Sequence, residues 1–393
     1  MSAAMTDKMA PPGRPRRAAA PQPRFDSALA GSVAGLLALG TVMVYSATIA
    51  ADSATLEMSS RHLLRHLLHI GLGAVLLLGA AAFPLERLQR VSQVGLLSGL
   101  LLLGAVLLFG VEVNGSRRWL ELAGLRLQPS EFVKIAAVIY FADYLARKQD
   151  DLQRFRVGVL NLGLVAGVIG LLLLLEPDFG TAVVLAAAAA VMLFLAGIRL
   201  WHFLLSVGAA AALTALLAWL EPYRAARLLS YRDPWADPFG HGFQLVQALI
   251  AIGRGEWFGA GLGSSIQKLF YLPHAANDFL IAVIGEELGA AGIFTVLGLF
   301  MLLLFRTFAV ARRALELGHR FPGLLAQGLG ALLAIQAALH VGVNTGLLPT
   351  TGLTLPLMSY GGSSMLSSMA AIGLILAVDR HSRPARVLAR NRR

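Results

Sequence analysis

The sequence of 393 residues contains no cysteine and few charged side chains. Without cysteine, the chain has no disulfide, no thiolate metal site and no cysteine nucleophile. Charged residues make up 14% of the chain and hydrophobic residues 57%, and the mean hydropathy is +0.69. Soluble globular domains carry about 25% charged residues, so this composition indicates a protein that crosses a membrane several times.

Long apolar runs recur along the chain. A helix needs roughly 20 apolar residues to cross a bilayer, and ten runs are close to this length. We therefore predict an all-α polytopic membrane protein of about ten transmembrane helices, with one long connection, 220–277, between the seventh and eighth. The predicted spans are about 27–50, 63–83, 91–112, 130–147, 157–176, 179–198, 201–219, 278–305, 322–346 and 354–378.

Lysine and arginine gather in the two tails and in the loops on the same side of the membrane as the tails. Cytoplasmic loops carry this excess, so both termini are predicted to be cytoplasmic and the 220–277 loop extracytoplasmic. Residues 1–26 are rich in Pro, Ala and Arg without apolar periodicity, which indicates a disordered tail. Residues 380–393 form a basic tail, and 27–379 form the transmembrane domain. The net charge of +11 therefore does not indicate a nucleic acid partner.

Three acids, Asp278, Glu286 and Glu287, lie at or just inside the start of the eighth predicted span. Ionisable residues in membrane segments are costly and usually functional, and Asp278 is the strongest catalytic candidate. Asp278, Ala282 and Glu286 are four residues apart, which predicts one polar helix face. Alternatively, Asp278 only caps a helix that follows the 273–277 loop, because Asp is a favoured N-cap residue.

The segment LQPSEFVKIA, 127–136, opens the fourth predicted span from its outer side, and Pro129 suits a first helical turn. Glu131 and Lys134 are three residues apart and so lie on the same helix face. One interpretation is a local ion pair that lets both charges enter the membrane. The other is that Lys134 reaches Asp278 and keeps it ionised, because a nearby cation lowers the pKa of a carboxyl group.

Two further polar segments lie on the predicted outer side. NGSRRWL, 114–120, combines a turn signal with Arg117 and Arg118, whose guanidinium groups suit phosphate oxygens. Anchoring at the membrane interface is the alternative for this segment. LEPDFG, 175–180, carries two acids in a short turn, where they either bind a hard cation or simply face water.

Two glycine-rich segments follow. GRGEWFGAGLG, 253–263, resembles a phosphate-binding loop only loosely, and without a preceding strand or a following GK[ST] a nucleotide-binding fold is rejected. LPTTGLTLPLMSYGGSSML, 348–366, is uncharged and broken by proline and glycine at membrane depth, where such backbone lies inside protein or along a wet cavity. It predicts a groove near the outer face, in which Asn344, Ser359 and Tyr360 offer neutral hydrogen bonds to a sugar or pyrophosphate.

Together these segments resemble the SEDS family of shape, elongation, division and sporulation proteins. The resemblance spans about 31–379 and is carried by NGSRRWL, QPSEFVK, EPDFGTA, EPYRAAR, RDPWADPFGHGFQ, GRGEWFGAGLG, QKLFYLPHAANDFLIAVIGEELG and PTTGLTLPLMSYGGSS. The TGLTLP run looks like the division branch more than the elongation branch. Two positions depart from the family pattern: His274 stands where an acid is usual and Thr351 where a lysine is usual. Neither is given a role.

The resemblance implies a peptidoglycan glycosyltransferase that polymerises lipid II on the outer face of the cytoplasmic, or inner, membrane at the division septum. It also implies that Asp278 is the family's essential acid and Lys134 the lysine with which it pairs. The implied partners are lipid II, the nascent glycan strand, a class B penicillin-binding protein of the FtsI division type and other division membrane proteins.

Polymerisation requires attack by a sugar 4-hydroxyl on an anomeric carbon, with undecaprenyl pyrophosphate leaving. A carboxylate base is expected, and we assign this role to Asp278; with a single well-supported acid, direct displacement is favoured. Arginines, or a divalent cation such as Mg²⁺ or Mn²⁺, would neutralise the pyrophosphate, and no dedicated metal site is predicted. The predicted substrate-binding residues are Arg117, Arg118, Glu131, Arg224, Glu286, Asn344, Ser359 and Tyr360.

A lipid II flippase is the main alternative, because a transporter also uses intramembrane charges and broken helices. A transporter needs a path to both faces, whereas nearly all polar clusters here lie at the outer ends of the spans, which favours the polymerase. An inactive scaffold is a third interpretation, but it leaves the charges of Asp278 and Lys134 without a purpose.

Overall fold

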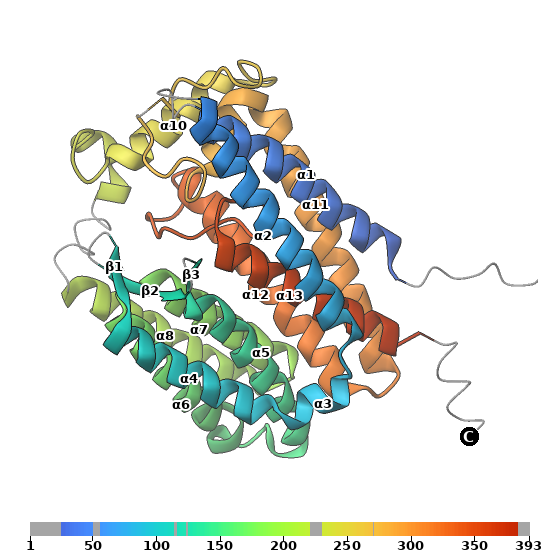
Figure 1. The fold of residues 1–393 in the computed structure, drawn as a ribbon. Coiled ribbons are helices and arrows are strands. Elements are labelled where there is room, and N and C mark those ends of the chain that lie inside the picture. The colour runs from blue at the N-terminus through green and yellow to red at the C-terminus, as the bar shows by residue number, and fades with distance from the viewer. Residues whose placement is uncertain are drawn as a thin grey trace, which may run out of the picture.

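The structure, a computed structural model, describes residues 25–49, 56–113, 116–122, 125–220, 230–269 and 271–383. Helices dominate and pack side by side in a bundle (Figure 1), which confirms the predicted helical membrane fold. Apart from residues 25–26 and 380–383, the two predicted tails lie outside the described residues. The helices that match the ten predicted spans are α1 (Ser27–Ile49), α2 (Leu56–Ala82), α4 (Ser92–Phe109), α5 (Pro129–Arg147), α6 (Asn161–Leu175), α7 (Phe179–Leu195), α8 (Leu200–Leu220), α11 (Leu280–Glu316), α12 (Arg320–Asn344) and α13 (Gly362–His381).

Within the described residues, seven helical segments are long and apolar enough to cross a membrane. They are α1, α2, α4, α11, α12, α13 and α6 together with the π-helical turn η2 (Arg156–Leu160) that precedes it. α7 and α8 contain shorter apolar helices. α5 carries two acids and two bases along its length. The total of ten spans and the orientation of the chain stay predictions.

Shorter elements connect these helices. α3 (Leu85–Arg90) follows α2, η1 (Gln149–Asp151) follows α5, and η3 (Pro234–Ala236) precedes α10 (Phe243–Gly255). A small antiparallel sheet of β1 (Val111–Val113), β2 (Ser116–Leu122) and β3 (Leu125–Leu127) separates α4 from α5. This sheet was not predicted and is a small addition to the helical fold. The segments VEV, LEL and LRL alternate between apolar and polar side chains, a pattern that favours strands.

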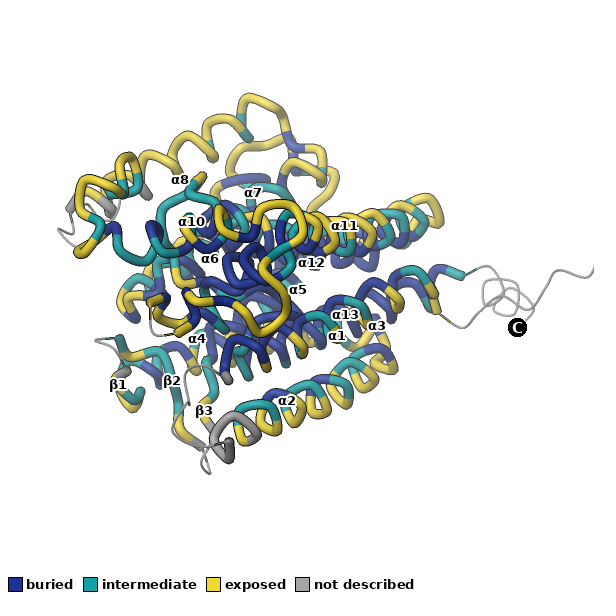
Figure 2. The backbone as a smooth tube through the Cα atoms, turned by 90° about the horizontal axis from the view of Figure 1, so that it is seen from above, coloured by how far each residue is buried: buried dark blue, intermediate teal, exposed yellow. Residues whose placement is uncertain are grey.

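The core of the bundle lies along α12 and α13. The most apolar stretch of α13 is 83% buried and that of α12 is 67% buried, whereas that of α2 is only 11% buried. Figure 2 shows α5 and α12 inside the bundle and α2 with exposed residues along its outer side. Exposed leucines and valines on α2, such as Leu64, Val75 and Leu78, are what a lipid-facing surface requires. α13 is therefore an internal helix, and its polar side chains are surrounded by protein and not by lipid.

α11 breaks near its first third. Gly289 has φ 69° and ψ −165°, a backbone conformation that only glycine adopts readily. The break frees the carbonyls of Glu286 and Glu287, which accept hydrogen bonds of 2.9 and 3.1 Å from the backbone N–H groups of Ala260 and Gly261. The backbone of the glycine-rich segment 253–263 therefore packs against the broken helix. This close packing accounts for its many glycines, and no bound phosphate is needed to explain them.

Ion pairs connect three helices at the end of the bundle where α1 begins and α13 ends, which is the predicted cytoplasmic end. Asp379 is fully buried near the end of α13 and accepts hydrogen bonds from Arg313 at 2.9 Å and Arg383 at 3.0 Å. Asp26, just before α1, pairs with Arg306 of α11 and donates its backbone N–H to Asp379 at 3.2 Å. These charges neutralise one another and tie α1, α11 and α13 together.

Candidate active site

Lys134 and Glu131 form an ion pair on the first turns of α5. The Lys134 Nζ lies 2.8 Å from Glu131 Oε1, and both side chains are almost fully buried. The other Glu131 oxygen accepts a hydrogen bond of 2.9 Å from Ser367 of α13. Of the two interpretations of Lys134, the local ion pair is present in the structure, and its pairing with Asp278 stays a prediction. Both carboxylate oxygens of Glu131 bind protein groups, and its predicted substrate contact stays a prediction.

Asp178 joins the start of α5 to the start of α7. Its Oδ1 caps α7 by accepting the Thr181 N–H at 3.3 Å, and its Oδ2 accepts the Ser130 hydroxyl at 3.1 Å. The backbone N–H of Gln128 donates to Ser363 Oγ at 2.8 Å, which brings in the start of α13. The first turns of α5, α7 and α13 are therefore fastened together.

Glu176 lies in the same α6–α7 turn, fully buried. Within the described residues, neither of its carboxylate oxygens has a hydrogen-bond partner. Burial, and then the negative charge of Asp178, raise the pKa of Glu176 to about 8, although Arg118 opposes the shift. This carboxyl group is therefore protonated through much of the neutral range.

Asp278 lies in a turn two residues before α11, half-buried. The predicted helix face of Asp278, Ala282 and Glu286 is wrong, because α11 begins only at Leu280 and its N-cap position is Phe279. Asp278 faces the loop between α12 and α13: a β-carbon built on Gly352 would lie 3.6 Å from Asp278 Oδ2. The carboxylate is thus held beside backbone that carries no side chain.

Three consecutive carbonyls of the Asp278 turn are bound by groups from elsewhere in the chain. The carbonyl of Ala276 accepts the Tyr360 N–H at 3.0 Å, and that of Asn277 accepts the Ser359 hydroxyl at 2.7 Å. The carbonyl of Asp278 itself accepts the side-chain amide of Asn344 at 2.9 Å.

Asn344 and Ser359 were predicted to bind substrate, and in the structure both side chains bind backbone groups of the protein. Asn344 is fully buried, and its amide oxygen also accepts the Ala282 N–H at 3.0 Å. Ser359 is 3% exposed, and its oxygen also accepts the Leu355 N–H at 2.9 Å. Their polar groups are therefore used on backbone. The ring of Tyr360 is partly exposed and lies 5.7 Å from the ring of His62 on α2, so its predicted substrate contact remains a prediction.

Glu286 also proves structural. Its carboxylate is fully buried and accepts hydrogen bonds from Arg254 at 2.7 Å, from the Ile266 N–H at 2.9 Å and from the Gln267 N–H at 3.3 Å. The adjacent Glu287 pairs with Lys268 at 2.6 Å. These two acids hold the loop that follows α10 on the first turns of α11. The predicted substrate contact of Glu286 stays a prediction.

The predicted arginine pair is divided by the strand that contains it. Successive side chains of a strand point to opposite faces. Arg117 is exposed and lies 3.5 Å from Glu112 on β1, whereas Arg118 donates to the Glu176 carbonyl at 3.3 Å and to the Pro177 carbonyl. The two guanidinium groups therefore point away from each other and do not form a joint site for one phosphate group. Arg224 lies outside the described residues.

These segments meet at one end of the bundle. The α6–α7 turn touches the α12–α13 loop, because a β-carbon on Gly180 would lie 3.1 Å from the Thr351 carbonyl and from the side chain of Leu353. The same loop reaches Asp278 through Gly352. In Figure 1 the sheet and the loop before α13 lie at the end of the bundle at which α5 and α13 begin. Polar groups from 128–134, 176–181, 276–278 and 351–367 therefore form one buried site.

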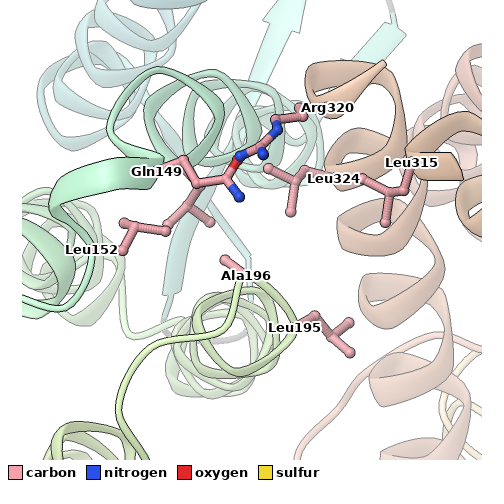
Figure 3. A pocket seen from close by; sticks show the side chains of 8 residues that line it. Gln149, Leu152, Leu195, Ala196, Leu315, Arg320 and Leu324 are labelled. Carbon is pink, nitrogen blue, oxygen red and sulfur yellow. The ribbon is translucent and has the colours of Figure 1, made fainter. Parts of the chain in front are cut away.

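A separate pocket lies at the other ends of the same helices. Its volume is about 250 Å³, and it is lined mainly by apolar side chains of α5, α7, α11 and α12. Figure 3 shows Gln149 and Arg320 on one side of it, with leucines around the rest. It includes none of the predicted site residues.

The described residues contain no group of three His, Asp or Glu side chains that would hold a metal ion. Mg²⁺ is usually bound by one or two carboxylates together with substrate phosphates, and a single half-buried acid such as Asp278 fits that arrangement only with a pyrophosphate present. The divalent cation stays a prediction.

Several site residues were not predicted. His340 is buried on α12 and contacts the Leu353 carbonyl at 2.8 Å through Nδ1, and Ser367 binds Glu131. His340 is four residues before Asn344, so a helical repeat of polar residues in an apolar span was the available signal. Ser367 had none, because serine is common at helix contacts in membranes.

The fold and this site define a helical membrane protein with buried polar groups gathered at one end of the bundle. A family model described as cell cycle protein, covering FtsW, RodA and SpoVE, matches residues 27–384. The chain belongs to this family, which confirms the resemblance found in the sequence.

Named relatives cover nearly the whole chain. It is 49% identical over 373 residues to a "Probable peptidoglycan glycosyltransferase FtsW" of Nitrosococcus halophilus, covering 94% of this chain and 96% of the relative. It is 49% identical over 364 residues to a protein of the same name from Aromatoleum aromaticum, covering 90% and 88%.

Two solved structures share the fold. A chain of a peptidoglycan synthase complex, described for its structural coordination of polymerization and crosslinking, superposes with a TM-score of 0.75 at 31% identity, covering 92% of this chain and 99% of that one. The rod shape determining protein RodA of Thermus thermophilus superposes with a TM-score of 0.66 at 30% identity, covering 91% and 97%.

Proposed function

We propose that this chain is a peptidoglycan glycosyltransferase of the FtsW type, which polymerises lipid II on the outer face of the cytoplasmic membrane during septal wall synthesis. Its family and its relatives named FtsW support the activity and the role in division. The observation that carries the proposal is the placement of Asp278: a half-buried carboxylate beside Gly352, on a turn whose backbone is fixed, at the end of the bundle where the buried polar groups meet.

Asp278 acts as the general base. The 4-hydroxyl of one sugar attacks the anomeric carbon of another, and the proton of the hydroxyl passes to Asp278. The new O4–C1 bond forms as the bond between C1 and the pyrophosphate oxygen breaks, and undecaprenyl pyrophosphate leaves with the electron pair. Such a base typically accelerates a reaction by 10²–10⁴-fold.

Lys134 remains the proposed cation that keeps Asp278 ionised, because a nearby positive charge lowers the pKa of a carboxyl group. Its ammonium is buried and bound to Glu131 at 2.8 Å. Arg118 lies on the same side of the bundle, beside the α6–α7 turn. A divalent cation on the pyrophosphate would add charge neutralisation, and no step above depends on it.

A class B penicillin-binding protein is the proposed partner. A chain of a peptidoglycan synthase complex that coordinates polymerization and crosslinking matches 92% of this chain, which supports a partner that crosslinks the strand. Placement at the septum in the inner membrane follows from the FtsW type.

The flippase alternative is less well supported. Transport requires a polar path that opens to each face in turn. At the predicted cytoplasmic end, Asp26 and Asp379 are neutralised by arginines and buried, and the nearby pocket is largely apolar.

The test is a reconstituted assay. Purified protein, alone and with a class B partner, is incubated with fluorescent lipid II and scored for long glycan chains. A parallel assay in vesicles measures movement of lipid II between leaflets. Chains without flipping are expected, and flipping without chains would favour the transporter.

A further inference from the structure

The Asp278 turn is held at every one of its last three carbonyls by donors from two distant segments. The donors are the Asn344 amide of α12, the Ser359 hydroxyl and the Tyr360 N–H, at 2.9, 2.7 and 3.0 Å. A surface turn normally leaves such carbonyls to water. Here all three carbonyls are bound by protein donors, which restrains the backbone that carries the Asp278 side chain.

The loop that faces Asp278 is fixed from the same helix. His340 lies one helical turn before Asn344, and its buried Nδ1 is 2.8 Å from the Leu353 carbonyl. A carbonyl only accepts, so this nitrogen carries the proton. Gly352, the neighbour of Leu353, has φ +70° and faces Asp278 Oδ2. Two residues of α12 therefore hold the two backbones that border the carboxylate.

We infer that Asn344 and Ser359 are positioning residues for Asp278: they hold the general base in place through its backbone and do not bind lipid II. This inference rests on the proposed function. Neither residue has a polar atom to spare, because Asn344 donates to two carbonyls and accepts one N–H, and Ser359 donates once and accepts once. A reacting group must be held within a fraction of an ångström, and a displacement of about 1 Å can cost about 100-fold in rate.

The experiment uses the purified full chain with its class B partner. Asn344→Leu removes the amide at nearly constant volume, and Ser359→Ala removes one hydroxyl from a buried turn. Asn161→Leu and Ser206→Ala are the controls, since these side chains bond to Tyr144, near the far end of α5, and to the Phe203 carbonyl of α8. Fluorescent lipid II gives the number of binding sites per protein, and kcat is expressed per binding-competent molecule.

Each site variant is expected to lower kcat by about 10–100-fold, with KM and the number of lipid II sites within twofold of wild type and both controls unchanged. A tenfold rise in KM with unchanged kcat would indicate that the side chain binds lipid II directly, and it would overturn the inference. Wild-type kcat in Ser359→Ala would also overturn it, whether or not Asn344→Leu folds. If the wild type itself makes no glycan, or Asp278→Asn makes as much as wild type, the proposed function fails instead.

Discussion

The Lys134 ammonium lies 2.8 Å from the Glu131 carboxylate, with 2% and 6% of the two side chains exposed. Removing one partner of a buried pair leaves an uncompensated charge, which costs about 3–5 kcal/mol. Lys134→Met is therefore expected to lower the unfolding free energy by that amount, measured by denaturation in detergent. The double variant Lys134→Met with Glu131→Gln is expected to recover most of the loss and to remain inactive.

Arg312→Ala provides the control for this prediction. Arg312 and Glu316 lie 3.5 Å apart on the outside of α11, 80% and 65% exposed, and exposed pairs contribute at most about 1 kcal/mol. If Lys134→Met were no more destabilising than Arg312→Ala, the buried pair would have no structural role.

Glu176 predicts a pH-dependent stability. Burial and the Asp178 charge raise its pKa from 4.5 to about 8 in the folded protein. Below pH 4.5 both states are protonated and there is no effect. Between pH 4.5 and 8 the unfolded state ionises first, so this group makes the protein less stable as pH rises. Glu176→Gln removes the effect, and its stability gain over wild type is expected to grow from near zero at pH 4 to a few kcal/mol at pH 8.

Thermal unfolding across this pH range measures the difference between variant and wild type. Glu121→Gln, at an exposed position on β2, is the matched control and is expected to give a constant difference. A constant difference for Glu176→Gln as well would mean that its carboxyl group is ionised normally.

Two glycines with similar backbone separate conformational strain from close packing. Gly197 has φ +85° with open space around a built β-carbon, whereas at Gly259, φ +81°, that carbon would lie 2.1 Å from the Glu287 carbonyl oxygen. Gly197→Ala is expected to cost roughly 1–2 kcal/mol for the left-handed backbone alone. Gly259→Ala is expected to cost about 1–3 kcal/mol more for overpacking. Equal melting temperatures would contradict the packing of this loop against α11.

Most of the helical fold could be predicted from the sequence, because long apolar runs in membrane proteins have few alternatives to helices. Helices match all ten predicted spans, although α13 begins at Gly362 rather than near 354. The prolines and glycines before Gly362 were recognised, but an apolar count does not show where such a segment stops being loop. The small sheet was missed because two of its strands have only three residues and the third has seven, too few to give a clear alternation between apolar runs.

The sequence indicated which segments carry the buried polar residues, but it did not indicate which partners these residues bind. Lys134 and Asp278 were selected as candidates because charged residues are rare in this chain, and the structure places both in the helical bundle near its polar end. The protein partners of Asn344, Ser359 and Glu286 were not predicted, because a sequence shows that a buried polar group needs a partner but does not show whether that partner is a ligand or the protein itself. Asp278 itself was placed on the helix, which begins two residues later at Leu280, because helix ends are uncertain by one or two residues.

The most direct test of the account is polymerisation of fluorescent lipid II by the purified complex with Asp278→Asn, which keeps the size of the side chain and removes the base. The account predicts a loss of at least about 100-fold in glycan synthesis, with unchanged melting temperature and lipid II binding. Glycan chains at the wild-type rate from this variant would contradict it.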